Sequence, residues 1–350
     1  MDQVALRAYI ELGSDLQAFL KGEKRNENLD ALLRDKMPEV HARNNWFTAD
    51  NVIQAIRGIA HMLDEARMKA WLEKYKTDNA RETSVGLIMA GNVPLVGFHD
   101  LMSVLLTGHK AQAKLATEDG VLLPIMLKGL SSHWPELEQR VEFTDRFSGH
   151  DAVIATGSNN SARYFEYYFR DVPHIIRKNR NSVAVLTGDE SEEDLVELGK
   201  DIFTFFGLGC RNVSKLFIPE GFDLDRIFGA IVNYGDVIQN KKYANNYDYY
   251  KAIHLMNKEQ LLENGFVLFK EDPGIYSPVA MLFYERYQDM DSVIQRLDAD
   301  AENIQCTVSS SDRIPGAIPF GRSQYPEPWD YADGVDTVEF LGELCNRGIG

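Results

Sequence analysis

Cysteine is scarce in this chain, with three residues among 350, at positions 210, 306 and 345. Their spacing contains no C-x-x-C pair of the kind that holds a structural zinc ion, and an odd number does not suit a disulfide framework. We therefore expect no metal site and no disulfides, and we expect the protein to work in the reducing cytoplasm.

An excess of positive charge is also missing, because 37 lysines and arginines stand against 53 aspartates and glutamates, for a formal net charge of −16. Proteins that bind nucleic acids need a basic face to displace counterions, so we expect no nucleic acid partner. No run of about 18 apolar residues occurs, which predicts no membrane span. The first residues carry Asp2 and no basic stretch before an apolar one, so we expect no export signal.

Apolar residues make up 44% of the chain, and its length suggests two domains rather than one. The first eighty residues look helical, and one long amphipathic helix is expected from Thr48, a residue type that caps helix starts. We interpret this part as a structural cover without chemistry of its own.

From Ser84 onward, apolar runs of strand length alternate with segments of helix length. The expected strands are 85–90, 111–116, 141–143, 152–155, 183–186, 213–218, 266–269, 279–284 and 304–309. The expected helices are 96–106, 119–130, 159–170, 194–206, 223–237, 242–264 and 337–345. This alternation predicts an α/β fold with a mostly parallel sheet covered on both faces, which binds ligands at the carboxyl ends of its strands.

Cys210 ends a glycine-rich turn, Gly207-Leu208-Gly209-Cys210, between an apolar helical segment and an apolar strand. The glycines leave the sulfur approachable, and backbone amides at the turn could lower the thiol pKa from about 8.5, so the pattern favours a nucleophile. The alternative is a small buried apolar residue, which is what most free cysteines are. The turn alone leaves both interpretations open.

Polar residues follow several of the expected strands. Asn92 could donate its side-chain amide to an oxyanion, or it could simply form a turn with its own backbone. Lys114 lies near the end of the second strand, where it could reach a ribose or a phosphate. The turn Thr156-Gly157-Ser158 precedes a helix whose N-terminal amides could bind phosphate. It matches neither a G-x-G-x-x-G fingerprint nor a P-loop, and an ordinary N-cap would account for it equally well.

Other polar residues receive structural interpretations. Histidines occur at positions 99, 109, 150 and 174 without the spacing of metal ligands. One of them could serve Cys210 as a base, although a structural or solvated role is the more ordinary interpretation. The acidic run 189–194 is interpreted as the solvated first turn of a helix, where the helix dipole favours carboxylates.

Taken in order, Asn92, Lys114, the turn 156–158 and Cys210 resemble the aldehyde dehydrogenase superfamily. More closely, the chain from about residue 84 to its end resembles the acyl-CoA reductases of the luminescence fatty-acid-reductase type. The matching stretches are 91–100, 108–110, 206–215, 318–321 and 329–336. The resemblance comes from the ordered set, since no single stretch is decisive.

The resemblance implies a role for each of these residues. Cys210 corresponds to the acyl-accepting nucleophile, and Asn92, with the backbone N–H of Cys210, corresponds to the oxyanion hole. Gly157 and Ser158 correspond to the turn that contacts the dinucleotide pyrophosphate, and Lys114 to the lysine that reaches the adenosine ribose.

The chain also departs from the family pattern. Oxidising aldehyde dehydrogenases carry a glutamate that activates the deacylating water, whereas the corresponding stretch here, Arg177-Lys178-Asn179-Arg180-Asn181, has no carboxylate. A second family glutamate, which grips the nicotinamide ribose, is replaced within 274–278. Losing the water-activating base suits an enzyme whose acyl-cysteine must survive until hydride arrives. Thr117 stands where NAD-preferring relatives have an acid that would repel a 2′-phosphate, so NADPH is expected and NADH is possible.

These implications predict an aldehyde-dehydrogenase-like fold in three parts. Residues 1–182 would form the N-terminal helices and a Rossmann-like dinucleotide domain, 183–312 the α/β catalytic domain, and 313–350 an arm returning to the core or to a neighbouring subunit. The expected function is NADPH-dependent reduction of a long-chain acyl-CoA to the aldehyde, through an acyl-cysteine and with release of CoA.

Three alternatives remain open: the oxidative, CoA-acylating direction, reduction of another activated acyl donor, and a catalytically silent nucleotide-binding partner. The C-terminal arm from residue 313 suggests a homo-oligomer, and a partner enzyme could deliver the acyl group.

Overall fold

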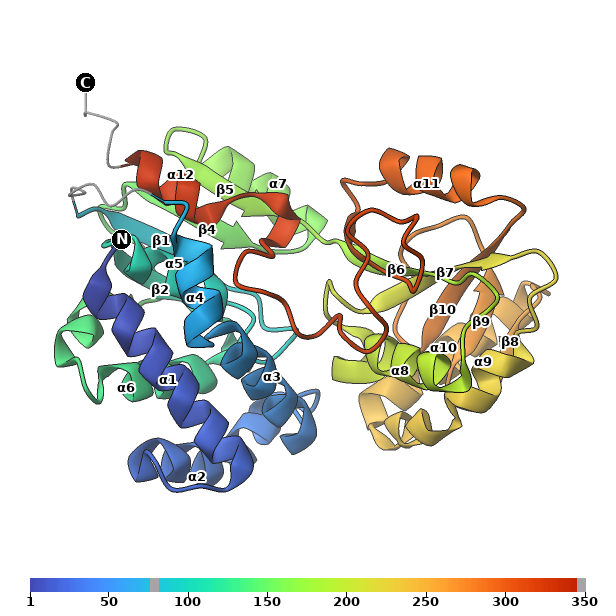
Figure 1. The fold of residues 1–350 in the computed structure, drawn as a ribbon, viewed down its shortest axis with the longest axis horizontal. Helices are drawn as coiled ribbons and strands as arrows, with labels where there is room; N and C mark the ends of the chain where they lie inside the picture. The colour runs from blue at the N-terminus through green and yellow to red at the C-terminus, as the bar shows by residue number, and fades with distance from the viewer. Residues whose placement is uncertain (76–81, 345–350) are drawn as a thin grey trace. The chain divides into compact units, whose positions relative to one another are not determined.

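The computed structural model describes residues 1–75 and 82–344. The chain forms two compact units, Met1–Asn179 with Tyr325–Gly350, and Arg180–Gln324 (Figure 1). The first boundary falls at Asn179, where the sequence suggested residue 182. The expected arm from residue 313 is divided at Gln324, so that its first part belongs to the second unit and its remainder to the first.

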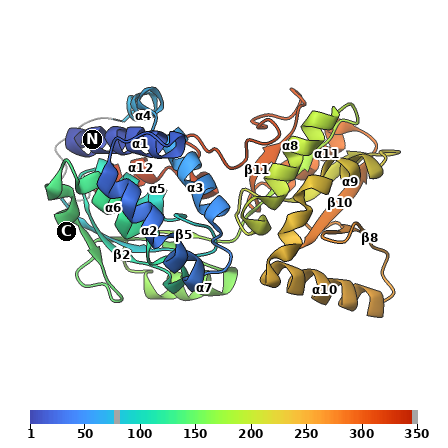
Figure 2. The same ribbon diagram turned by 90° about the horizontal axis from the view of Figure 1, so that it is seen from below.

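The first unit is built on a parallel five-stranded sheet of order β3-β2-β1-β4-β5. Its strands are β1 (Ser84–Ile88), β2 (Lys110–Lys114), β3 (Val141–Phe143), β4 (Ala152–Thr156) and β5 (His174–Arg177). The connecting helices are α5 (Phe98–Leu106), α6 (Leu122–Ser131) and α7 (Asn159–Tyr168), with the short turns η1 (Thr117–Asp119) and η2 (Pro135–Arg140). Figure 2 shows α5 and α6 on one face of the sheet and α7 on the other, as expected for a Rossmann-like domain.

Helices before the sheet cover the face formed by α5 and α6. They are α1 (Gln3–Lys21), α2 (Glu27–Arg43), α3 (Ala49–Met62) and α4 (Glu65–Leu72). Thr48 caps α3 by accepting from the amide of Asn51 at 3.2 Å, as predicted. The prediction of a single long helix from Thr48 is wrong, because α3 ends at Met62 and Asp64 caps a new helix, α4, by accepting from the amide of Arg67.

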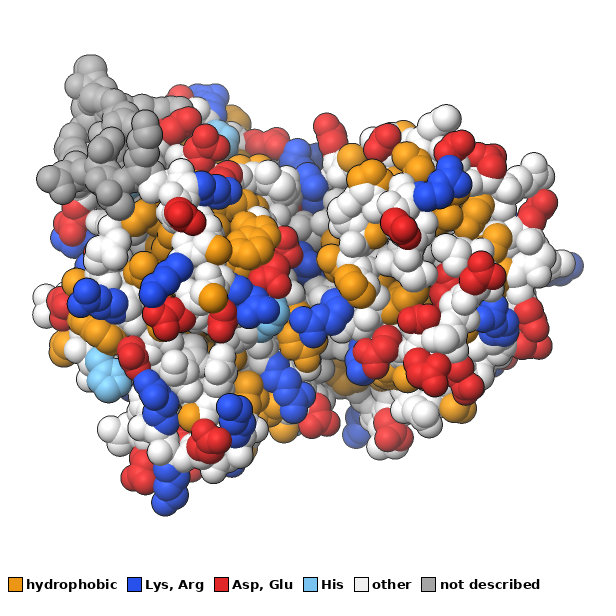
Figure 3. Space-filling model, viewed as in Figure 1, with side chains coloured by type: hydrophobic (Ala, Val, Ile, Leu, Met, Phe, Trp, Pro, Cys, Tyr) orange, Lys and Arg blue, Asp and Glu red, His pale blue; other side chains and the backbone are white. Residues whose placement is uncertain are grey.

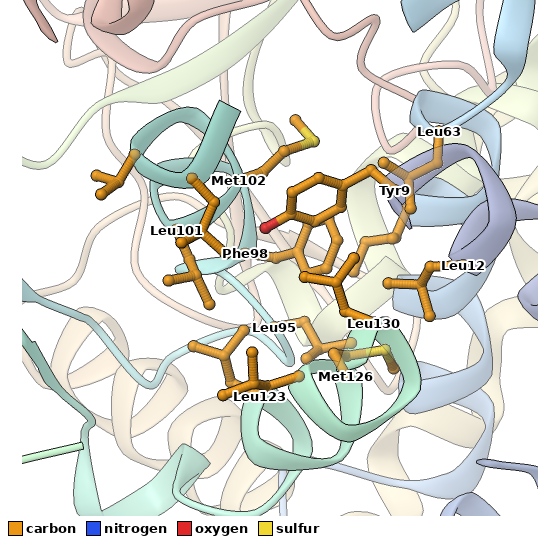
Figure 4. Packing of buried hydrophobic residues seen from close by; sticks show 14 of the residues in the cluster. Tyr9, Leu12, Leu63, Leu95, Phe98, Leu101, Met102, Leu123, Met126 and Leu130 are labelled. Carbon is orange, nitrogen blue, oxygen red and sulfur yellow. The ribbon is translucent and has the colours of Figure 1, made fainter. Parts of the chain in front are cut away.

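Apolar side chains from these helices form one core with α5 and α6. Tyr9 and Leu12 of α1 meet Phe98 of α5 and Leu130 of α6, as Figure 4 shows. Burying this surface explains why the first helices are apolar on one side, and it confirms their role as a cover for the domain.

The segment from Tyr325 returns to the first unit. Glu327 lies 2.9 Å from the Nε2 atom of His61, and the Tyr331 hydroxyl accepts from Trp71 Nε1 at 2.8 Å. The turn η5 (Ala332–Gly334) and the helix α12 (Thr337–Leu344) follow. The expected last helix reached Cys345, which lies outside the described residues.

The second unit contains a six-stranded sheet of order β11-β6-β7-β10-β9-β8, in which only β8 is antiparallel to its neighbour. The strands are β6 (Asn181–Val185), β7 (Val213–Pro219), β8 (Leu262–Glu263), β9 (Leu268–Glu271), β10 (Met281–Tyr287) and β11 (Ile304–Val308). The helices are α8 (Glu192–Phe203), α9 (Asp225–Ala230), α10 (Lys241–Met256) and α11 (Met290–Ala299), with the turns η3 (Thr204–Gly207) and η4 (Val232–Gln239).

Each face of this second sheet has its own apolar core. Leu216 and Ile218 of β7 pack with α8 and α9, whereas the intervening Phe217 packs with Val293 of α11. The period of two along the strand therefore divides its side chains between two helical layers. The helix expected over 242–264 is shorter than predicted, because α10 ends at Met256 and the strand β8 lies at 262–263. The strand β5 and the helix α11 were not predicted either.

Two global expectations concern charge and membranes. On the face viewed in Figure 3, lysines and arginines are scattered among acidic side chains. Among residues 1–75 and 82–344, no helix is long and apolar enough to cross a membrane.

Candidate active site

Cys210 lies in an unusual turn that joins η3 to strand β7. Its side chain is exposed, and it forms no disulfide with the other described cysteine, Cys306. Phe205, Phe206 and Gly207 precede it with φ angles of 53°, 58° and 76°. Left-handed backbone is unfavourable for bulky residues and persists only where the surrounding contacts determine it.

Asn212 supplies those contacts from a position that is 1% exposed. Its Nδ2 donates to the carbonyl oxygens of Thr204 at 2.7 Å and Asp201 at 3.0 Å, at the end of α8. Its Oδ1 accepts from the amide of Gly209 at 2.9 Å. Carbonyls at a helix end lack partners within the helix, so one buried side chain both satisfies this end and closes the turn around Cys210.

Ser182 of β6 holds the same turn from the neighbouring strand. Its hydroxyl donates to the carbonyl oxygen of Cys210 at 3.0 Å and lies 3.0 Å from the Sγ atom of Cys306. Cys306, on β11, therefore lies beside the turn that carries Cys210. No pattern in the sequence associates these two cysteines.

The chain segment 321–323 is fastened next to the turn by Asp201. The Asp201 carboxylate accepts from the amides of Gly321 at 2.7 Å and Ser323 at 2.9 Å. Arg211, which follows Cys210, donates through Nε to the carbonyl of Ser323 at 2.5 Å. Burial raises the pKa of Asp201 to about 6, although the hydrogen bonds from Ser323 and Gly321 act in the opposite direction.

The other candidate residues gather at one edge of the first sheet. Asn92 follows β1, Lys114 ends β2, and Thr156 ends β4. Because β1 pairs in parallel with both β2 and β4, the carboxyl ends of these three strands lie side by side. Asn92 and Lys114 are exposed there. The strand order reverses between β1 and β4, which is where such sheets bind nucleotides.

The turn 156–158 leads directly into α7 (Asn159–Tyr168). Ser158 is the N-cap, with its hydroxyl accepting from the amide of Ser161 at 3.2 Å. A Cβ atom on Gly157 would lie 2.9 Å from both Ser161 and the ring of Phe165, so the backbone at this turn packs closely against α7 and favours glycine. The N-terminal amides of such a helix favour anions, and the exposed, uncharged Thr117 on η1 adds no repulsion toward a phosphate.

The histidines of the first unit have structural contacts. His99 Nε2 lies 2.9 Å from the carbonyl of Pro328, and burial lowers the pKa of His99. His109 contacts Thr83 and the carbonyl of Leu341, and His174 contacts two backbone carbonyls. His150 packs edge-on against two phenylalanine rings. These contacts support the structural interpretation.

The stretch 177–181, which lacks a carboxylate, begins with a residue that makes structural contacts. Arg177 is 4% exposed and donates through Nη2 to Asp100 at 2.6 Å and to Thr337 at 2.9 Å. It thus anchors α12 to the first unit. Within the acidic run 189–194, Ser191 is the N-cap of α8, which begins at Glu192, and it makes a capping box with Asp194. Glu190 is buried rather than solvated as expected, and it accepts from the amides of Thr187 and Gly188. Within the described part of the chain, no group of three potential ligands could hold a metal ion.

The structure thus brings Asn92, Lys114, Thr117 and the turn 156–158 to one sheet edge of the first unit, and it places Cys210 on a turn of the second. Sequence reasoning missed Asn212, Ser182 and Asp201. The sequence indicates Asn212 only weakly, as a polar residue directly before an apolar strand.

Comparison with known proteins adds the fold family. No protein-family model matches the sequence, and a search of curated proteins finds no match either. An aldehyde dehydrogenase of Mycobacterium tuberculosis complexed with NAD+ is similar in structure, with a TM-score of 0.59 at 15% identity over 96% of this chain and 84% of that one. The chain has the aldehyde dehydrogenase fold.

Two further aldehyde dehydrogenase structures also match most of this chain. Aldehyde dehydrogenase 21 of Physcomitrella patens, in complex with the reaction product succinate, gives a TM-score of 0.60 at 12% identity over 97% of this chain and 88% of that one. An aldehyde dehydrogenase of Bacillus cereus in complex with NAD+ gives 0.57 at 15% identity over 89% and 73%. The expected fold class, an α/β fold of the aldehyde dehydrogenase type with a Rossmann-like first domain, is therefore confirmed.

Proposed function

We propose that this protein reduces a long-chain acyl-CoA to the aldehyde with NADPH, and that Cys210 is the nucleophile. The observation that carries the proposal is the exposed Cys210 on a turn fixed by the buried Asn212, in a chain with the aldehyde dehydrogenase fold. A side chain placed at the surface by a strained, well-anchored turn is typical of catalytic positions.

The chemistry of the first step is acyl transfer. The Cys210 thiolate attacks the thioester carbonyl carbon, and the carbonyl electrons move to oxygen. The side-chain amide of Asn92 and the backbone N–H of Cys210 are the proposed donors to this oxyanion. When the tetrahedral adduct collapses, the bond to the CoA sulfur breaks, CoA leaves as a thiolate that takes a proton from solvent, and an acyl-cysteine remains.

The first unit supplies the proposed cofactor site. Lys114 would bind the adenosine ribose, the turn 156–158 and the amides of α7 would bind the pyrophosphate, and Thr117 would tolerate the 2′-phosphate of NADPH. When bound, the reduced nicotinamide supplies the hydride that converts the acyl-cysteine to a thiohemiacetal. Cleavage of the bond to Cys210 then releases the aldehyde and restores the thiolate.

The acyl-cysteine must resist water until it is reduced. Arg177, the first residue of the stretch that corresponds to the water-activating glutamate, is buried in an ion pair with Asp100. An arginine side chain stays protonated in proteins and offers only donors, so it does not act as a base. This supports reduction rather than hydrolysis of the intermediate.

A substrate panel tests the proposal. Purified protein is offered acyl-CoA thioesters of increasing chain length, with acyl-AMP and acyl phosphate of matched length, and each is tested with NADPH and with NADH. We expect nicotinamide absorbance to fall fastest with long-chain acyl-CoA and NADPH. No oxidation of either cofactor with any donor would refute the proposal and favour a silent nucleotide-binding partner.

The oxidative direction is a second candidate. Two of the similar structures are described as complexes with NAD+, the oxidised cofactor. The reverse reaction, aldehyde with CoA and oxidised cofactor, should therefore be measured alongside. A faster reverse reaction at equal saturation would assign the enzyme to CoA-acylating oxidation.

Self-association belongs to the same proposal. Tyr164, Tyr167 and Tyr168 of α7 are each at least 66% exposed, which is unusual for large aromatic side chains. Burying them between copies of the chain would account for their exposure here. Sedimentation analysis should show a dimer or larger oligomer, and a monomer at micromolar concentration would contradict this part of the proposal.

A further inference from the structure

The turn that carries Asn92 ends in a residue with uncommon backbone geometry. Leu95 has a φ angle of 61°, although it is neither glycine nor asparagine. Its side chain is 4% exposed and packs in the core of the first unit near Leu123, as Figure 4 shows. A leucine adopts this conformation only where its surroundings enforce it.

Asp119 enforces the conformation from η1. Its Oδ2 accepts from the backbone amide of Leu95 at 2.8 Å, across 24 residues of sequence. This amide belongs to the turn between β1 and α5, so neither a neighbouring strand nor a helical turn supplies a backbone carbonyl to accept from it. The hydrogen bond therefore fixes the end of the turn that follows Asn92.

The other end of the turn is held by a second buried side chain. Asn44, which caps the C-terminus of α2 and is 3% exposed, donates through Nδ2 to the carbonyl of Gly91 at 3.2 Å. A Cβ atom on Gly91 would lie 2.6 Å from that of Ala116, so the turn presses directly against the segment that carries Asp119. Asn92 is thus flanked on both sides by anchored backbone.

The carboxyl group of Asp119 is buried with only one of its oxygens hydrogen-bonded within the part of the chain that the structure describes. The residue is 7% exposed, and its Oδ1 has no hydrogen-bond partner among the described residues. It lines a small cavity with Met89, Leu115 and Leu123. Burial raises the pKa of Asp119 to about 7, because only the amide of Leu95 opposes the loss of solvation. Burying a group of this kind is unfavourable in itself.

We propose that Asp119 is a positioning residue that holds the turn 91–95 in the conformation from which Asn92 donates to the oxyanion. The proposal rests on the function proposed above and assigns Asp119 no contact with substrate. It acts through the amide of Leu95, while Asn44 holds the opposite end of the turn. Sequence reasoning placed Asp119 at the start of a helix and gave it no role.

The test measures acylation of Cys210 without cofactor, so that effects on nucleotide binding do not enter. CoA release is followed as free thiol over a range of acyl-CoA concentrations. Asp119→Ala removes the acceptor for the Leu95 amide, and we expect the maximal acylation rate to fall about tenfold with half-saturation unchanged. Asp119→Asn keeps an amide oxygen at that place and should retain most of the rate.

A double-mutant cycle separates positioning from general damage. Asn92→Ala should lower acylation on the order of a hundredfold, and Asn92→Ala with Asp119→Ala should be no slower than Asn92→Ala alone. Asp15→Ala is the matched control, because Asp15 is a buried carboxylate of the same unit that pairs with Arg25. It should leave the acylation rate unchanged.

Two results would show that Asp119 does not position the turn of Asn92. Multiplying effects in the double variant, or full-rate acylation by Asp119→Ala, would overturn the inference. If Asp119→Ala does not fold, Asp119→Ser takes its place, since its hydroxyl is too short to reach the same amide. Absence of acylation in the unaltered protein would refute the proposed function itself, which distinguishes the two failures.

Discussion

The side chain of Asn212 donates a 2.7 Å hydrogen bond to the carbonyl oxygen of Thr204. This bond connects the start of β7 to the end of α8 and encloses the turn with Cys210 between them. Three consecutive left-handed residues, 205–207, lie inside the closed segment. The reactivity of Cys210 should therefore depend on a residue that does not touch the substrate.

Replacing Asn212 should test this dependence. Asn212→Ala leaves buried carbonyls of Thr204 and Asp201 without their donor, so we expect a loss of about 2 to 3 kcal/mol in unfolding free energy. Acylation by acyl-CoA should fall at least about tenfold because the turn loses its definition. Asn246→Ala is a suitable control, since that amide donates to Lys242 one turn back in α10. An unchanged acylation rate in a folded Asn212→Ala protein would contradict the assigned role.

Thr117 should control the choice between the two cofactors. A carboxylate in its place would repel the 2′-phosphate, so Thr117→Glu should raise the KM for NADPH about tenfold and leave that for NADH nearly unchanged. Thr117→Gln has a similar size without the charge and should behave like the unaltered protein. Equal changes with both cofactors would show that Thr117 does not lie near the phosphate.

Lys114 should matter for cofactor binding alone. Lys114→Met removes the charge at the carboxyl end of β2 and should raise the KM for NADPH about tenfold. Acylation without cofactor should be unaffected. Lys110, at the other end of the same strand, pairs with Glu82 at 2.6 Å and offers the matched control Lys110→Met. Equal losses in both variants would argue against a specific role for Lys114.

Asp201 should make stability depend on pH. Burial raises its pKa from 3.8 to about 6, with the nearby Glu197 acting in the same direction. The folded protein then holds this proton more tightly than the unfolded chain. The stabilisation is complete below about pH 4 and is lost as the pH rises through about 6, by up to about 3 kcal/mol.

Unfolding in urea at several pH values between 4 and 8 measures this dependence. Asp201→Asn cannot titrate, so its profile should be flatter than that of the unaltered protein over this range. The unfolding free energy of Asp201→Asn should be lower at every pH. The Asn side chain has one acceptor oxygen, so its NH₂ group would face one of the two backbone N–H groups of Gly321 and Ser323. Parallel profiles for the two proteins would contradict the assignment to Asp201.

Local patterns predicted the architecture where the signal itself is local. The apolar runs at β4 and β7 mark strands because a buried strand can be recognised from its own side chains. The helix break at Asp64 was hidden because the apolar spacing continues across it, although an aspartate followed by Glu65 is a common helix start. The short strand β5 follows Pro173 and has polar residues at both ends, which concealed it.

The candidate site depends even more on contacts that local sequence patterns do not predict. The glycines at 207 and 209 indicated a turn at Cys210, but nothing local predicts left-handed backbone at Phe205 and Phe206, since aromatic residues avoid it. The anchors of the two turns, Asn212 and Asp119, depend on partners distant in the sequence. Such contacts arise only when the chain has folded, and the roles assigned to the site residues stay predictions.

The most direct test of the account is the intact mass of the protein after incubation with a long-chain acyl-CoA and no cofactor. We expect one added acyl group, its loss on later addition of NADPH, and no adduct in Cys210→Ala. Cys306→Ala should still acquire the adduct, because Cys306 lies beside the turn without being the nucleophile. An acyl group that persists in Cys210→Ala, or that never forms in the unaltered protein, would contradict the central claim.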